Sequence, residues 1–468
     1  MKKTGLSLFA VILLFFCGCA STINNNTADQ KVKYVFLFVA DGFGENHFKL
    51  LKDETGAPAL SQFDLVRHTG TLNHEGKITD SAASGTAIAC GVKTYNGAIG
   101  MTPDRRPVSS IAKEFKAAGF KVGIISTSPI NDATPAAHYA NAFNRSERSL
   151  IIHDLLFSGF DFFGASNFYP DSRYRPTADE YLALIARKYR VTSGTDWSDL
   201  DPNDHNFLIN QMVRDFPAAP RNSPSLADFT AKAVELLDNP DGFFLMVEEG
   251  TTDAYSHLND AGSLLRSAMD FDKAVAVALE FQKKHPENTL IVVTADHNTG
   301  GLYFLENYSP GNTSLLYQSM PWDSLDRMTK DHYREKAPVD LFERDLVDAL
   351  SLGRITPAER NSIRPYFAHF ILKQRKSNKT DDGYSTINPP AENNGKDFHN
   401  PLVLGFTRLR DKRNGLAWRG FGHTEEKVLT FAKGPGAEMF DREDLENTSI
   451  AILIREIALK NNQPTAVK

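Results

Sequence analysis

Four short stretches of the chain are continuous apolar runs, rich in β-branched and aromatic residues and bordered by polar or turn-forming positions. Strands buried on both faces of a parallel sheet have this pattern, whereas half-buried strands alternate apolar and polar residues. The sequence therefore predicts four central strands. They cover residues 34–40, 121–127, 242–248 and 289–295.

Helical patterns separate these predicted strands, at residues 109–118, 225–237 and 262–284. Strands that alternate with helices predict an α/β fold, with a central, mostly parallel sheet flanked by helices on both faces. A further strand at 427–432 is expected to return to the sheet, and a helix at about 444–459 closes the chain.

The region before that last strand has a different character. The sequence Thr356-Pro-Ala-Glu359 combines a capping box with proline at the first helical position, and so predicts the start of a helix. Residues 373–396 are polar and rich in Asn, Lys and Asp. We interpret residues 304–414 as a long insertion, lid- or crown-like, partly helical and partly loop. The core then comprises residues 33–303 and 415–468.

The N-terminal residues 1–19 are typical of a targeting segment. Lysines at positions 2 and 3 precede an apolar run, residues 6–16, that is too short to span a bilayer. The run leads into Cys-Gly-Cys, which resembles a bacterial lipoprotein signal with Cys19 as the lipidated residue. Simple cleavage nearby is the alternative. Residues 20–32 are predicted to form a flexible tether. We expect export to the periplasm, or a lipid-anchored place on the outer membrane or cell surface of a bacterium.

The amino-acid composition limits which binding partners and which stabilising bonds we expect for this chain. The chain has 468 residues, 41% of them hydrophobic, which is ample for a large core. A net charge of -6 argues against nucleic acid as a specific partner, because such binding depends on clustered Lys and Arg. Of three cysteines only Cys90 lies outside the signal segment, so the mature chain is predicted to contain no internal disulfide.

Acidic residues lie at the carboxyl ends of the predicted strands. Asp41, Glu248 and Asp296 stand at the ends of three of them, and Asp132 follows the remaining one by a few residues. Ligands of α/β sheets bind at this edge. Carboxylates gathered there repel one another unless a cation neutralises them.

Histidines near these carboxylates suggest which cation binds. Asp253 and His257 are four residues apart and share one face if that segment is helical. His297 directly follows Asp296, and His423 lies in a glycine-flanked turn. Mixed His and Asp ligands suit Zn²⁺, while oxygen-only sets suit Mg²⁺. Each feature alone is more typical of a surface pair or a turn, but their occurrence together at strand ends favours a metal site.

Ser81 is the candidate nucleophile. It opens a stretch of small residues, 81–89, that is predicted to be helical. Free N–H groups and the helix dipole at such an end favour an alkoxide or a phosphate. The alternative is that Ser81 or Asp80 merely caps the helix. No histidine lies nearby in sequence, so a metal would have to activate the hydroxyl.

Taken in order, these segments resemble the motifs of the alkaline phosphatases. The resemblance implies hydrolysis of small phosphate monoesters at alkaline pH through a phosphoserine intermediate on Ser81. It also implies two Zn²⁺ and one Mg²⁺, and a homodimer. The matching segments are Val39–Gly44, Asp80–Ala87, Asp132–Ala137 with Arg145, Val247–His257, Thr294–Asn298 and Gly422–Thr424.

The resemblance assigns a role to each matching residue. Arg145 would grip two phosphate oxygens in bidentate fashion, which a lysine does less well. The first zinc would be held by Asp253, His257 and His423. The second would be held by Asp41, Asp296 and His297. Magnesium would be held by Asp41, Thr134 and Glu248, with Asp132 reaching it through water.

The chain departs from the family pattern at two positions near the site. Ala254 stands where relatives often carry Lys or His near the phosphate, and Glu425 stands where Gly is common. Two other functions stay open on the sequence alone. One is a phosphodiesterase or sulfatase of the same superfamily, and the other is a surface lipoprotein that binds phosphate or metal without turnover.

Overall fold

The computed structural model describes residues 32–170, 177–192, 196–201, 207–210, 224–311, 314–377 and 400–460. The signal segment with Cys19 and the tether up to residue 31 lie outside the described residues, as does most of the polar stretch 373–396. Export, lipidation and the proposed domain boundaries therefore stay predictions. Within the described part, no helix is both apolar and long enough to cross a bilayer.

The four predicted strands are confirmed, and they lie side by side in the centre of one sheet. β1 (Tyr34–Ala40) pairs in parallel with β7 (Phe243–Glu249) on one side and β8 (Thr289–Thr294) on the other. β3 (Lys121–Ser126) pairs in parallel with β7. Every residue of β1, β7 and β8 is buried, which explains the uninterrupted apolar runs.

Outer strands extend this centre to a nine-stranded sheet among the described residues, in the order β2-β13-β8-β1-β7-β3-β4-β6-β5. β13 (Val428–Lys433) is the expected returning strand, and it lies antiparallel between β8 and β2 (Leu65–Thr69). Three short strands complete the opposite edge, and they are too short to give a recognisable hydrophobic pattern in the sequence. They are β4 (Phe162–Ala165), β6 (Phe207–Asn210) and β5 (Arg190–Thr192).

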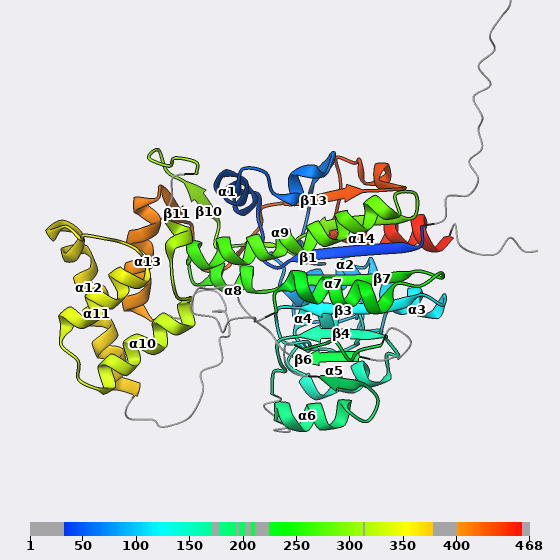
Figure 1. Ribbon diagram of the computed structural model, residues 1–468, viewed down its shortest axis with the longest axis horizontal. Helices are drawn as coiled ribbons and strands as arrows, with labels where there is room; N and C mark the ends of the chain where they lie inside the picture. Colours follow the sequence, from blue (N-terminus) through cyan, green and yellow to red (C-terminus); the bar gives the residue numbers. More distant parts are fainter. Residues whose placement is uncertain are drawn as a thin grey trace, which may run out of the picture.

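Helices cover both faces of the sheet (Figure 1). Alternate residues of β1 point to opposite faces, so Phe36 and Phe38 pack with one apolar cluster and Val35 and Leu37 with the other. The first cluster includes α7 (Leu226–Leu237) and α9 (Ala261–Lys284), and the second includes α2 (Ser81–Cys90), α3 (Ile111–Ala117) and α14 (Asn447–Ile454). The predicted helices are thus confirmed, with ends shifted by a few residues.

Shorter helices fill the connections. A π-helical turn, Arg455–Leu459, continues α14, and Cys90 is buried as a free thiol. The α-helices of these connections are α1 (Glu45–Thr55), α4 (Ala133–Ala136), α5 (Arg148–Phe157), α6 (Ala178–Ile185) and α8 (Thr251–His257). The 3₁₀ turns are Ala59–Gln62, Leu315–Tyr317 and Ala437–Phe440.

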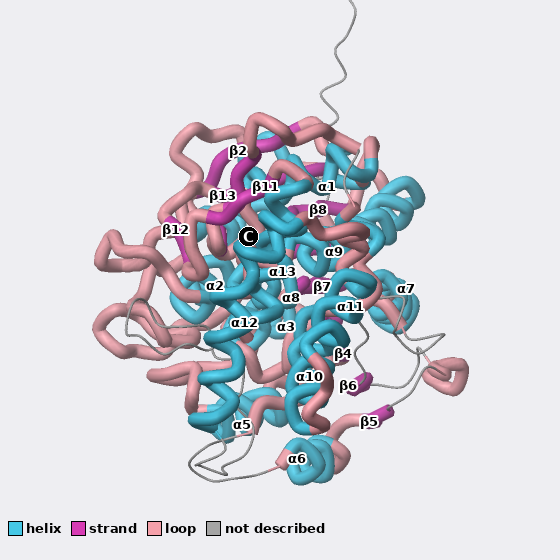
Figure 2. The backbone as a smooth tube through the Cα atoms, turned by 90° about the vertical axis from the view of Figure 1, so that its left-hand side faces the viewer, coloured by secondary structure: helices cyan, strands magenta, loops and turns pink. Residues whose placement is uncertain are grey.

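The interrupting region is largely helical where it is described. It contains α10 (Trp322–Arg334), α11 (Val339–Ala349), α12 (Pro357–Ser377) and α13 (Pro401–Arg413). The capping box at the start of α12 forms as predicted, because Glu359 N–H donates to Thr356 Oγ1 and the Glu359 carboxylate accepts from Thr356 N–H. These helices form a lobe beside the strand end from which α8 follows β7, and Figure 2 looks onto that lobe.

A two-stranded ladder closes the base of the lobe. β10 (Leu302–Phe304) leads out of the core and pairs antiparallel with β11 (Leu416–Trp418), which leads back. Beneath it, the buried Arg410 of α13 donates to Asp411 and to Asp260 at the start of α9. The lobe is therefore tied to the core by strand pairing and by buried charges.

Candidate active site

The register of the central strands brings the predicted carboxylates to one edge. Val39 of β1 lies opposite both Glu248 of β7 and Thr294 of β8, so Asp41, Glu248 and Asp296 end up around the same point. α8 begins directly after β7 and is helical over Asp253 and His257, as the four-residue spacing predicted. Parallel pairing alone thus accounts for the gathering of acidic groups.

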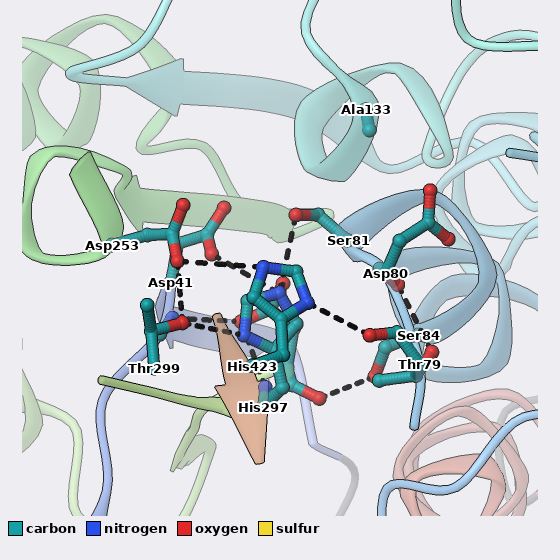
Figure 3. Close-up of polar contacts among 12 residues, drawn as sticks. Asp41, Thr79, Asp80, Ser81, Ser84, Ala133, Asp253, His297, Thr299 and His423 are labelled. Carbon is teal, nitrogen blue, oxygen red and sulfur yellow. Dashed lines mark hydrogen bonds and ion pairs between the residues drawn. The ribbon is translucent and has the colours of Figure 1, made fainter. Parts of the chain in front are cut away.

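Ser81 is the first residue of α2, and Asp80 is its N-cap, with the Asp80 carboxylate accepting from Ala83 N–H at 2.9 Å. The capping role therefore belongs to Asp80, and the Ser81 hydroxyl is available for other contacts. It lies 3.2 Å from His297 Nε2 (Figure 3). One turn further, Ser84 Oγ donates to the Asp296 carbonyl at 2.6 Å and so fixes α2 against the end of β8.

His423 is brought to Ser81 by a second small ladder. β12 (His423–Thr424) pairs antiparallel with β9 (Asn298–Thr299), which places His423 opposite Thr299. His423 Nδ1 lies 2.8 Å from the Thr79 carbonyl, so Nδ1 donates and Nε2 keeps a free lone pair. The His423 ring stacks on that of His297, with 3.6 Å between ring centroids.

The three residues expected around the first zinc are brought together. His257 Nε2 lies 3.3 Å from Asp253 Oδ2 and 3.2 Å from His423 Nε2. His257 Nδ1 donates to the Phe421 carbonyl, so its Nε2 also carries a lone pair. Two imidazole lone pairs that face each other beside a carboxylate make a site for a proton or a cation.

The three residues expected around the second zinc also converge. His297 Nε2 lies 3.1 Å from Asp296 Oδ2 and 3.6 Å from Asp41 Oδ1. Asp296 is oriented by Gly42 N–H and His297 N–H, which both donate to its Oδ1. Asp296 Oδ2 and Asp41 Oδ1 are buried and accept no hydrogen bond from any described residue. Such orphaned carboxylate oxygens fit a cation.

The oxygen-rich candidates lie next to Asp41, outside these two sets. Asp132 caps α4, which contains Thr134, and Glu248 accepts a hydrogen bond from Ser126 Oγ. The charges of Glu248 and Asp132 both act on Asp41. An all-oxygen set of this kind fits Mg²⁺ better than Zn²⁺.

Arg145 joins this edge from the loop after α4. Its Nη2 donates to Asp132 Oδ1 at 2.8 Å, and its Nη1 lies 3.5 Å from Asp80 Oδ2. Burial lowers the pKa of Arg145, but Asp132 and Asp80 outweigh that effect and raise it, so the guanidinium is held charged next to Asp80, the residue before Ser81. A second guanidinium, that of Arg148, lies 3.6 Å from the same Asp132 oxygen.

Burial and mutual repulsion dominate the electrostatics of the site. Burial, followed by the charge of Asp296, raises the pKa of Asp41 well above its usual range, and burial raises that of Asp296 to about 7. Asp253 differs, since His257, His423 and His297 outweigh burial and lower its pKa. Burial, then His423, lowers the pKa of His297 and keeps its imidazole neutral. A neutral imidazole among carboxylates is the protonation state that metal binding requires, and His297 meets that condition. Asp253 outweighs burial at His257 and raises its pKa.

Comparison with known proteins agrees with this geometry. A family model described as alkaline phosphatase matches residues 32–154 and 206–459. The chain belongs to the alkaline phosphatase family. It is a hydrolase of this type, as the sequence motifs implied.

Two bacterial relatives match nearly the whole chain. Alkaline phosphatase 3 of Bacillus subtilis is 30% identical over 90% of this chain and 88% of its own length. Alkaline phosphatase 4 of the same organism is 27% identical over 98% and 97%. Among solved structures, the cold-active alkaline phosphatase of Shewanella sp. is 25% identical, covers 91% of this chain and 99% of its own, and has a TM-score of 0.73.

The structure of the Thermus thermophilus enzyme has the same TM-score, 0.73, at 23% identity, and covers 92% of this chain and 91% of its own. That similarity supports the fold.

Within the site, the sequence missed Thr299, whose hydroxyl contacts Asp253 and His297, and the Phe421 carbonyl, which orients His257. A lone threonine and a backbone oxygen carry no chemical signature in a sequence, so neither could be singled out there.

Proposed function

We propose that this chain hydrolyses phosphate monoesters at alkaline pH through a phosphoserine intermediate on Ser81, assisted by two Zn²⁺ and one Mg²⁺. The observation that carries the proposal is the position of the Ser81 hydroxyl. It lies 3.2 Å from His297 Nε2, and His297 belongs to both groups of three side chains that can hold a metal: Asp253, His297 and His423, and Asp41, Asp296 and His297.

The side chains divide into metal-holding sets according to their chemistry. The mixed sets, Asp253 with His257 and His423, and Asp41 with Asp296 and His297, suit Zn²⁺. The oxygen set of Asp41, Thr134 and Glu248, with Asp132 close by, suits Mg²⁺. When bound, these cations lower the pKa of hydroxyl groups and stabilise negative charge on the entering and leaving oxygens.

The chain itself supplies the nucleophile and its orientation. The N-terminal position on α2 aims the Ser81 oxygen at the converging side chains, and the bond from Ser84 to Asp296 keeps the helix from moving away. In the first step the Ser81 hydroxyl gives up its proton and its oxygen bonds to phosphorus, while the bond from phosphorus to the ester oxygen breaks and the alcohol leaves with a proton. In the second step water attacks the phosphorus, the bond to the Ser81 oxygen breaks, inorganic phosphate leaves and the Ser81 hydroxyl regains its proton.

Arg145 supplies phosphate recognition in this proposal. Its guanidinium is pre-oriented by Asp132 and Asp80, so little side-chain entropy is lost when phosphate binds. A monoester dianion offers two free oxygens for the bidentate fork, and a diester offers a poorer match. Because the proposed contacts all go to the phosphoryl group, we expect broad tolerance of the leaving group.

Replacement of the nucleophile tests the proposal. Ser81→Ala should lower the hydrolysis rate of an aryl phosphate monoester by about 10³-fold or more, while inorganic phosphate still binds. Acid quenching of the parent protein with labelled monoester should trap label on Ser81. Ser158→Ala is the control, because the Ser158 hydroxyl bonds the Leu155 carbonyl, the Tyr189 hydroxyl and the Phe160 N–H at the end of α5, none of which is a proposed site residue.

Unchanged hydrolysis in Ser81→Ala would remove Ser81 from the proposed role. The same assay with an aryl phosphodiester and an aryl sulfate separates the alternative activities, and monoester is expected to be the best substrate. If the parent protein binds zinc and phosphate without any turnover, the non-catalytic alternative holds instead. Export with lipidation at Cys19, and a homodimeric state, remain part of the proposal.

A further inference from the structure

Thr299 connects the two groups of side chains that the proposed function assigns to zinc. It lies in β9, fully buried, where its N–H donates to the Gly42 carbonyl at 3.0 Å and its backbone pairs with His423. Its hydroxyl oxygen lies 2.5 Å from Asp253 Oδ1 and 3.2 Å from His297 Nδ1 (Figure 3). The proposed function assigns Asp253 to the first zinc position and His297 to the second.

Proton counting fixes the direction of both hydrogen bonds. The Thr299 hydroxyl carries a single proton, and the ionised Asp253 carboxylate can only accept. The hydroxyl therefore donates to Asp253 and can only accept from His297. Nδ1 of His297 must then carry the ring proton, which leaves a free lone pair on Nε2, the atom that faces Ser81, Asp41 and Asp296. This is the tautomer that can bind a metal through Nε2.

We propose that Thr299 is a positioning residue that orients one ligand of each zinc position through a single hydroxyl group. The inference rests on the proposed function, and neither the motif resemblance nor the sequence pattern assigned Thr299 any role. Loss of the hydroxyl should weaken both zinc positions together. Loss of a residue that supports one position should weaken that one alone.

Three variants isolate the hydroxyl. Thr299→Val keeps the shape and removes the hydroxyl, and Thr299→Ser keeps the hydroxyl and removes the methyl group. Thr430→Val is the matched control. Thr430 is also fully buried in a strand, and its hydroxyl lies between those of Thr69 and Thr294, at 2.6 and 2.8 Å, without touching a proposed ligand.

Zinc affinity of the full-length protein is measured by competition with a chromogenic chelator, which resolves the two equivalents. Thr299→Val should weaken both by about 10- to 100-fold, the range typical of lost outer-shell partners. Thr299→Ser and Thr430→Val should stay within about threefold of the parent. An unchanged affinity in Thr299→Val, or a loss confined to one equivalent, would overturn the inference, and so would a loss of both in Thr299→Ser.

A second measurement needs no variant of Thr299. After a chelator has removed bound metal, nitrogen NMR of the histidine-labelled protein should place the His297 ring proton on Nδ1. The His297 resonance is assigned as the one that is missing from a His297→Gln sample. A proton on Nε2 would overturn the inference even if Thr299→Val failed to fold. If the parent protein bound no zinc at all, the metal assignment of the proposed function would fail. Tight zinc binding by both parent and Thr299→Val would reject only the role of Thr299.

Discussion

Replacement of Arg410 by methionine tests how the helical lobe supports the site. The Arg410 side chain is fully buried on α13, where it donates to Asp411 Oδ1 at 2.6 Å, to Asp260 Oδ1 at 3.0 Å and to the Gln318 side chain. Asp260 and Asp411 are themselves buried. Methionine keeps much of the volume of arginine but leaves both carboxylates without their cation.

The cost follows from the burial of both partners. Removing one member of a buried ion pair leaves an uncompensated charge and typically costs about 3–5 kcal/mol. Because two carboxylates share this guanidinium, we expect Arg410→Met to fall in the upper part of that range. Arg408 lies on the same helix but is exposed, where it donates to the Tyr366 hydroxyl and lies over the Phe421 ring. Exposed contacts of these kinds are weak, so Arg408→Met should change the stability by less than about 1 kcal/mol.

The loss of Arg410 should also affect the proposed zinc site through a defined chain of contacts. Asp411 Oδ2 accepts from Trp418 Nε1 at 2.8 Å, and the Trp418 ring packs so closely on Gly300 that a Cβ there would lie 2.6 Å from it. Gly300 N–H donates to the Gly422 carbonyl at 2.8 Å, directly before His423. An Asp411 without its arginine should loosen this chain of contacts and weaken the zinc equivalent that we assign to His423.

Urea denaturation followed by tryptophan fluorescence measures the stability, and chelator competition measures zinc affinity. The expected result for Arg410→Met is a loss of about 3–5 kcal/mol together with a larger affinity loss for one zinc equivalent than for the other. A loss below about 1 kcal/mol, or one equal to that of Arg408→Met, would refute the reasoning.

Two further predictions follow from single side chains. Arg145→Lys should weaken competitive inhibition by inorganic phosphate about 10- to 100-fold, because the bidentate fork becomes a point charge, and equal inhibition constants would contradict this. Burial raises the pKa of Glu249 from 4.5 to about 7. A raised carboxyl pKa contributes stability below about pH 4.5 that is lost as pH rises through about 7, so Glu249→Gln should gain about 3 kcal/mol relative to the parent protein between pH 4.5 and 8. Urea midpoints at both pH values in excess zinc and magnesium test this, and parallel pH profiles would exclude it.

The sequence predicted correctly those elements in which every residue has the same degree of burial. β1 is buried along its whole length, so its apolar run marked it directly, and the carboxylates after such strands could be placed at one edge without coordinates. β5 and β6 are only a few residues long and exist because they pair with each other and with β4. Pairing between distant segments leaves no periodic signal in so short a stretch, which is why these strands were missed.

The same limit explains which site residues were found. Asp41, His297 and Ser81 belong to motifs in which the residue type is itself the chemical signal. Thr299 and the Phe421 carbonyl act by orienting other groups, and their effect depends on which atom they face in the folded chain. A sequence can therefore identify candidate ligands. Which ring nitrogen of a histidine ligand carries the proton depends on its hydrogen-bond partners, and these are known only from the folded structure.

The buried carboxylates of the site lower the stability of the fold when no cation is bound. Burial raises the pKa of Asp41, Glu248 and Asp296, so each carboxylate ionises only at a cost when no cation is present. Bound cations would relieve that cost and add their binding free energy to folding. With Cys90 as a free, buried thiol, the described chain has no disulfide to stabilise it in their place. The free energy gained by burying the apolar core of the sheet offsets this repulsion. The carboxylates that the sheet holds together are the groups that surround Ser81.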